Sequence, residues 1–122
     1  MAGKYTDVLA ARKELCEKCL HYHSIDPLEY LGLSYAMFRI AKGDVRQAAI
    51  GGTNIGRHSD TISGRAAMLS GTLKGSAGIP KEWIAMFRPE ESLERIRTKA
   101  GRIAHFITKR KLPVMRERQA IP

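Results

Sequence analysis

Apolar side chains recur every three or four residues along most of the chain, which is the spacing of an amphipathic helix. Between residues 4 and 23 the apolar positions are Val8, Leu9, Leu15, Cys16, Cys19 and Leu20. A second apolar stripe consists of Leu28, Leu31, Tyr35 and Phe38. No stretch shows the strict alternation of a half-buried strand. The pattern therefore predicts an all-α protein, built as a helical bundle.

Local signals indicate where two of these helices begin and end. Asp26 can cap a helix, Pro27 suits its first position, and Glu29 completes a capping-box pattern. Gly43 is expected to end this helix, because glycine is the usual residue after a helix C-terminus. Asp44 is expected to open a short helix that runs to about residue 50.

A longer helix is expected from about residue 60 to about residue 73, with Ser59 or Asp60 as its cap. Gly64, Ala67 and Gly71 fall on one face of this helix, because they are three and four residues apart. We expect this face to pack closely against another helix. Such packing would offset the cost of about 1 kcal/mol that each glycine brings to a helix interior.

The C-terminal part predicts two further helices. Pro80 begins a short one that carries Trp83, and a last one follows and is limited by Pro113. Residues 113–122 are expected to form a flexible tail. A chain of 122 residues accommodates one modest core, so we expect residues 1–122 to form a single domain, or part of one.

The charge distribution restricts the partners. The chain has a formal net charge of +9, and residues 95–118 hold nine lysines and arginines but a single acid, Glu117. A basic surface attracts phosphate-bearing partners. This stretch, however, contains one aromatic residue, Phe106, and matches no nucleic-acid-binding motif, so it does not favour a nucleic acid. The simpler interpretation is a solvated helix face.

The composition also favours a cytoplasmic protein without a membrane partner. No apolar run approaches the roughly 20 residues of a membrane span, and the first ten residues lack the apolar core of a secretion signal. The only cysteines, Cys16 and Cys19, are too few and too close for a disulfide framework. A zinc site made with His21 and His23 is a weaker alternative, because neighbouring ligands on one helix cannot all face one point.

The stretch 51–64 has the densest glycine spacing, and we interpret its first part, from Gly51 to Gly56, as a loop. The spacing of these two glycines matches a phosphate-binding loop, but Arg57 and His58 stand where lysine and serine or threonine belong. No strand precedes the loop either. A nucleophilic triad from the consecutive His58, Ser59 and Asp60 is also disfavoured, because neighbouring side chains rarely face one another.

A hard-cation site is the third interpretation of this stretch. Asp60 and Thr61 carry the oxygen ligands that Mg²⁺ prefers, and Ser59 can add another. One carboxylate and two hydroxyls need further carboxylates to hold such an ion. The alternative is that Asp60 only caps the helix that follows.

Three features resemble the C-terminal portion of the ADP-ribosylglycohydrolase family (DraG-like and crystallin J1-like proteins). They are the run Asn54-Ile55-Gly56-Arg57-His58-Ser59-Asp60-Thr61-Ile62, the small-residue helix after it, and the run Gly78-Ile79-Pro80-Lys81-Glu82-Trp83. The resemblance covers roughly residues 26–88. It implies an all-α enzyme that hydrolyses the glycosidic bond between ADP-ribose and a protein side chain or related acceptor. It also implies a pair of Mg²⁺ (sometimes Mn²⁺) ions.

The resemblance implies roles for individual residues. Asp60 and Thr61 match the second aspartate and the threonine of the family's Asp-x-Asp-Thr motif, so they would be metal ligands. His58 takes the place of the first aspartate and would be a modified ligand or a neighbouring group. The residues that would shape the ligand loop are Gly52, Asn54, Gly56 and Ser59.

Two features depart from the family pattern. The imidazole of His58 is a poor Mg²⁺ ligand and removes a negative charge. The family's N-terminal acidic motif has no counterpart, the nearest run being Tyr5-Thr6-Asp7. We therefore expect a chain that corresponds to the C-terminal half of the family domain, whose site is completed by a partner chain or a second copy. The alternative is a truncated or degenerate, non-catalytic relative that serves as a helical interaction module.

Overall fold

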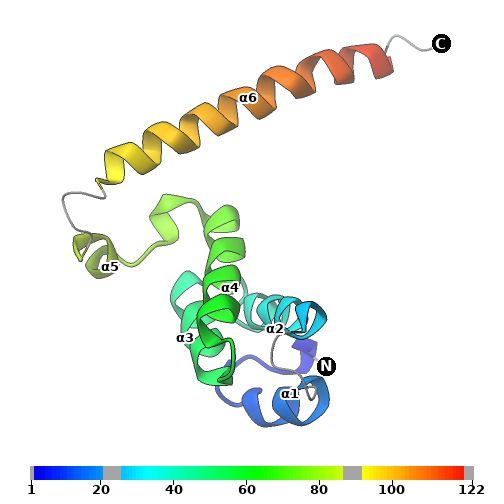
Figure 1. Cartoon of the computed structure of the whole chain (residues 1–122), viewed down its shortest axis with the longest axis vertical. Coiled ribbons are helices and arrows are strands. Elements are labelled where there is room, and N and C mark those ends of the chain that lie inside the picture. Colours follow the sequence, from blue (N-terminus) through cyan, green and yellow to red (C-terminus); the bar gives the residue numbers. More distant parts are fainter. Residues whose placement is uncertain (1, 21–25, 87–91, 120–122) are drawn as a thin grey trace. The chain divides into compact units, whose positions relative to one another are not determined.

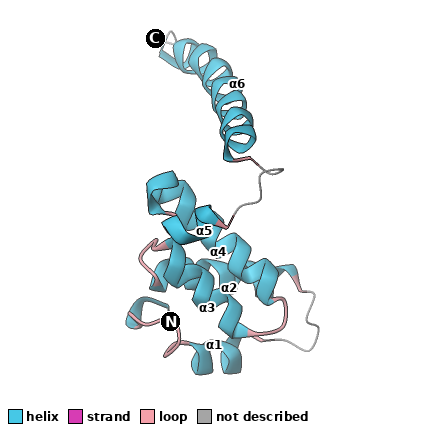
Figure 2. Ribbon diagram, turned by 90° about the vertical axis from the view of Figure 1, so that its left-hand side faces the viewer, coloured by secondary structure: helices cyan, strands magenta, loops and turns pink. Residues whose placement is uncertain are grey.

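The computed structural model describes residues 2–20, 26–86 and 92–119, and for residues 110–119 the backbone alone. These residues form helices and no strand (Figure 2), which confirms the all-α prediction. The elements are η1 (Ala2–Lys4), α1 (Arg12–Cys19), α2 (Pro27–Ile40), α3 (Val45–Ile55), α4 (Ser59–Lys74), η2 (Ser76–Gly78), α5 (Lys81–Ala85) and α6 (Leu93–Gln119). They fall into two compact units, Met1–Glu82 and Trp83–Pro122.

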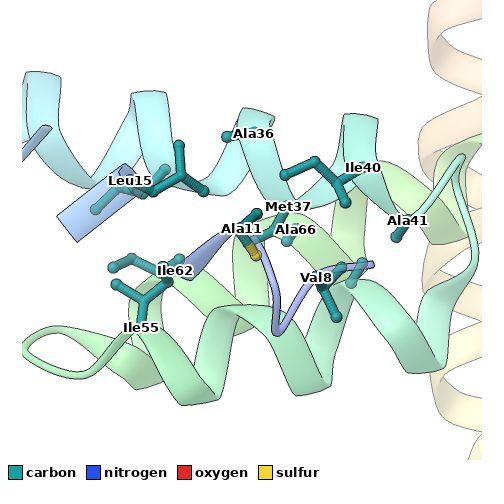
Figure 3. Close-up of a cluster of buried hydrophobic side chains, with 12 residues drawn as sticks. Val8, Ala11, Leu15, Ala36, Met37, Ile40, Ala41, Ile55, Ile62 and Ala66 are labelled. Carbon is teal, nitrogen blue, oxygen red and sulfur yellow. The ribbon is translucent and has the colours of Figure 1, made fainter. Parts of the chain in front are cut away.

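Helices α2, α3 and α4 pack on one another and form the body of the first unit, and α1 contacts α2 and α3 (Figure 1). Figure 3 shows the buried side chains that they share. This core consists of Val8, Ala11, Leu15, Leu33, Ala36, Met37, Ile40, Ala41, Ala48, Ile55, Ile62 and Ala66.

The helix starts at α2 and α3 agree with the prediction. Asp26 precedes α2, and its Oδ1 accepts a hydrogen bond from the Leu28 backbone N–H at 2.8 Å. Asp44 precedes α3 and accepts one from the Gln47 N–H at 2.7 Å. Between the two helices Gly43 has a φ of 75°, a conformation that glycine adopts without strain.

The face of α2 that enters the core differs from the prediction. Leu28, Leu31 and Tyr35, expected to form the buried stripe, are exposed. Leu33 and Met37 are buried instead, together with Ala36 and Ile40. The helix carries apolar residues on nearly every side, so its periodicity did not indicate which side faces the other helices.

Helices α3 and α4 approach each other most closely at Gly52. A Cβ atom on Gly52 would lie 2.5 Å from Ser63 Cα and 2.7 Å from Ser63 N, so only glycine fits there. The Ser63 hydroxyl donates a hydrogen bond to the Ala49 carbonyl oxygen at 2.9 Å across the same contact. The predicted close packing at Gly64 and Gly71 is wrong within the described residues, because a Cβ at either position would have no neighbouring atom within 4 Å.

Two other helix limits differ from those predicted. The N-terminal helix α1 is shorter than the predicted span of 4–23, and α6 continues past Pro113 to Gln119. The flexibility of residues 113–122 and the single-domain organisation stay predictions. Within the described part of the chain, no helix has both the length and the apolar character that a membrane crossing requires.

Candidate functional site

A tight turn connects α3 to α4 and holds the residues that the sequence singled out. Gly56 has a φ of 88°, and Arg57 follows with a φ of 53°. A non-glycine residue in the left-handed region is strained by about 1 kcal/mol or more. The surrounding structure must therefore hold Arg57 in place.

Glu29 restrains Arg57 through an ion pair. It lies in the first turn of α2, its side chain is 3% exposed, and both carboxylate oxygens are 3.4 Å from Nη1 of Arg57. A buried carboxylate is costly without a cationic or hydrogen-bonding partner. The Arg57 side chain is 32% exposed, so the guanidinium compensates this charge while part of it still reaches the surface. The ion pair therefore ties the turn to α2.

Tyr30, next to Glu29 on α2, contacts both the turn and α4. Its ring meets the His58 ring edge-on, with 6.5 Å between centroids and 66° between planes. The guanidinium carbon of Arg65, in the second turn of α4, lies 4.8 Å from the Tyr30 ring centre, within the range of a cation–π interaction. Two guanidinium groups are thus held by neighbouring residues of α2, close to the start of α4.

The residues predicted to bind metal lie at that start. His58 occupies the cap position of α4 without a side-chain hydrogen bond to the helix, and Ser59, Asp60 and Thr61 are its first three residues. The prediction that Ser59 or Asp60 caps the helix is therefore wrong. Asp60 is exposed and Thr61 is half-buried. The carboxylate of Asp60 is favourably placed in the first turn, near the positive end of the helix dipole.

Three of the four predicted loop residues lie in helices, and one of them, Ser59, is the first residue of α4. Gly52 and Asn54 belong to α3, which extends to Ile55, so the loop expected from residue 51 to 56 is wrong and the connection is shorter. Gly52 serves the contact with Ser63. Asn54 donates a hydrogen bond from Nδ2 to the Ile50 carbonyl oxygen at 2.9 Å. A role of either residue in ligand binding stays a prediction.

The residues present do not form a complete metal site. Asp60 and Thr61 are oxygen donors of the kind that Mg²⁺ prefers, but they come from one helical turn. Among the described residues no three histidine, cysteine, aspartate or glutamate side chains come together in a metal-binding group. A pair of dications at Asp60 would therefore need carboxylates from outside the described residues. Cys16 and Cys19 are free thiols, and His21 and His23 lie outside the described residues.

Sequence reasoning missed Glu29, Tyr30, Arg57 and Arg65 as one cluster. It assigned Glu29 to a capping box, although Glu29 lies four and eight residues before the buried Leu33 and Met37, on the same side of α2. An acid on a buried apolar stripe is a signal for a cationic partner elsewhere in the chain. That signal could be recognised only once the buried side of α2 was known.

Comparison with known families bears on these residues. The model of the family described as ADP-ribosylglycohydrolase matches residues 3–113, which includes α1 to α5 and most of α6. The comparisons with curated proteins and with solved structures gave no significant match. The family match extends well beyond residues 26–88, where the resemblance was first identified. Since it covers most of the chain, this protein belongs to the ADP-ribosylglycohydrolase family.

Proposed function

We propose that this chain contributes the Asp60–Thr61 side of an ADP-ribosylglycohydrolase active site and acts in metal-assisted hydrolysis of an ADP-ribose glycosidic bond. The acceptor would be a protein side chain or a related group. The observation that carries the proposal is the presence of Asp60 and Thr61 in the first turn of α4, directly after a turn that Glu29 holds in place. Membership of the family supports it.

The cationic groups beside α4 suit the substrate. ADP-ribose carries a diphosphate, and guanidinium groups bind phosphate oxygens through charge-assisted hydrogen bonds. Arg57 and Arg65 are both held by α2, through Glu29 and Tyr30 respectively, and both are accessible in part. Backbone N–H groups at the start of α4 can add to the attraction for an anion. These residues would bind and orient the diphosphate.

Asp60 and Thr61 would hold one side of the Mg²⁺ or Mn²⁺ site, with His58 beside them. A bound ion of this kind would act as a Lewis acid and orient water. The remaining carboxylates would come from a partner chain or from a second copy of this one. In this proposal the chain binds ADP-ribose weakly by itself and hydrolyses substrate only with that partner.

Isothermal titration of the 122-residue chain with ADP-ribose, with and without Mg²⁺, tests the proposal. We expect Mg²⁺ to strengthen binding, and Asp60→Asn to abolish that strengthening. Glu17→Gln is the matched control, because Glu17 is an exposed acid on α1 and its loss changes the net charge equally. Binding that ignores Mg²⁺, or that responds equally to both substitutions, would remove Asp60 from the site.

A second candidate function is a non-catalytic interaction module. The observation that favours it is the number of large apolar side chains exposed in the first unit, with Leu28 at 78%, Met68 at 69% and Leu73 at 62%. Exposed apolar surface indicates a protein-binding surface when it is contiguous. Sedimentation distinguishes the two: a compact monomer that binds ADP-ribose would argue against an obligate partner.

A further inference from the structure

Helix α6 carries an apolar seam, and Phe106 is exposed beside it. Its members are alternately three and four residues apart, and they are Leu93, Ile96, Ala100, Ile103 and Ile107. Ile96, Ile103 and Ile107 are 47%, 60% and 46% exposed. Alternation of three and four is the spacing with which one helix packs along another, whereas a helix that lies on a globular core has a broader apolar stripe. The seam therefore fits a single partner helix.

The charges around the seam are of one sign. Arg97 lies on one side of it and Lys99 on the other, at the positions that flank a helix–helix contact. Residues 93–109 hold five basic side chains and one acid, Glu94. A second copy of α6 would bring like charges together, which disfavours self-pairing. Acidic side chains at the flanks of the partner would meet Arg97 and Lys99 favourably.

The same arrangement argues against a lipid surface. A helix at a membrane interface buries a broad apolar face and directs its cationic groups toward the anionic headgroups. The apolar side of α6 consists of the seam with Phe106 beside it, and a helical projection places Arg102 and Lys109 on the opposite side of the helix. Those two charges would point away from a membrane that contacts the seam.

We propose that α6 packs along an acidic amphipathic helix from outside residues 1–122. This helix has apolar residues at the alternating positions and glutamate or aspartate at the flanks. Ala100, in the middle of the seam, leaves room for a large apolar side chain of the partner. The contact joins this chain to another protein segment.

Fluorescence anisotropy of the 122-residue chain with two synthetic peptides tests the proposal. Both peptides are about three heptads long with the same apolar seam, and one has glutamate and the other lysine at the flanking positions. We expect the glutamate peptide to bind at least about tenfold more tightly at low salt, and this preference to shrink at about 0.5 M salt.

Two single variants locate the contact. Ile103→Gln is expected to weaken binding of the glutamate peptide by about tenfold or more, because it removes a buried apolar side chain from the seam. Thr98→Gln, on the opposite side of α6, is the matched control and should change affinity by less than about twofold. Both positions are exposed in the structure, and circular dichroism checks that helicity is kept.

Several results would overturn the proposal. They are equal binding of the two peptides, no binding of either, and equal effects of the two variants. Self-association that Ile103→Gln abolishes would identify a second copy as the partner. Binding to phosphatidylglycerol vesicles without binding to the glutamate peptide would identify a lipid surface instead.

Discussion

Glu29 and Arg57 are 28 positions apart in the chain, and their ion pair links the first turn of α2 to the strained residue before α4. Arg57→Ala would leave a carboxylate buried beside an alanine. We expect it to lower the free energy of unfolding by about 2 kcal/mol, below the full cost of breaking a buried pair, because Arg57 is partly exposed. Urea denaturation measures this loss.

A double-mutant cycle that combines Arg57→Ala with Glu29→Gln separates the interaction energy of the ion pair from the other effects of each substitution. We expect the double variant to lose clearly less than the sum of the two single variants. Losses that add within about 0.5 kcal/mol would show that the two side chains do not depend on each other.

The contact between α3 and α4 predicts opposite effects for two glycine substitutions. Gly52→Ala should destabilise the protein by about 2 kcal/mol or more, because its Cβ would lie 2.5 Å from Ser63 Cα. Gly64→Ala has open space around the added methyl group and should stabilise α4 by about 0.5–1 kcal/mol. Thermal unfolding of both variants checks this. A similar Tm change in both would contradict the close approach at Gly52.

The stability of the fold should depend on pH through Glu14 in the N-terminal segment. Hydrogen bonds from Lys18, Lys4 and Tyr5 lower the pKa of Glu14 from 4.5 to about 2. A carboxyl group whose pKa is lower in the folded state stabilises the fold above its unfolded pKa, and this contribution is lost as the pH falls from 4.5 toward 2. Glu14→Gln should therefore lower the urea midpoint at pH 6, and the difference from the wild type should vanish near pH 2. If the difference in urea midpoint persists near pH 2, the substitution acts through packing and not through the charge of Glu14.

The departure at His58 gives a prediction that depends on the proposed function. His58→Asp places a carboxylate at the cap position of α4, beside Asp60, and gives the Asp-x-Asp-Thr pattern that the family resemblance implies. We expect tighter Mg²⁺ binding, by about tenfold, because a hard cation prefers carboxylate oxygen to imidazole nitrogen. Calorimetric titration with Mg²⁺ measures it. His105→Asp on α6 is the control, and an equal gain there would indicate a general charge effect.

Local chemistry made parts of the fold predictable. Asp26 and Asp44 mark helix starts because a cap depends on residues two or three positions away. The family was recognisable because the run 54–62 is continuous in the sequence.

The parts that were not predictable depend on contacts distant in sequence. Gly51 and Gly52 are compatible with a loop or with tight helix packing, and Ser63 on α4 and Val8 near the N-terminus decide for packing. The pairing of Glu29 with Arg57 likewise requires α2 and the turn to be brought together first. Ser70 is a third example. Its hydroxyl is buried and has no hydrogen-bond partner among the described residues. No local sequence pattern indicated this burial.

The contact at Gly52 also affects the thermodynamics of ligand binding. Because Ser63 is held both by the glycine and by the Ala49 carbonyl, α4 cannot slide along α3 without losing both contacts. Asp60 and Thr61, three and two residues before Ser63, are therefore presented in one orientation before any ligand arrives. Such preorganisation lowers the conformational entropy that must be lost on binding, so a partner that supplies the remaining carboxylates would meet a ready-made surface.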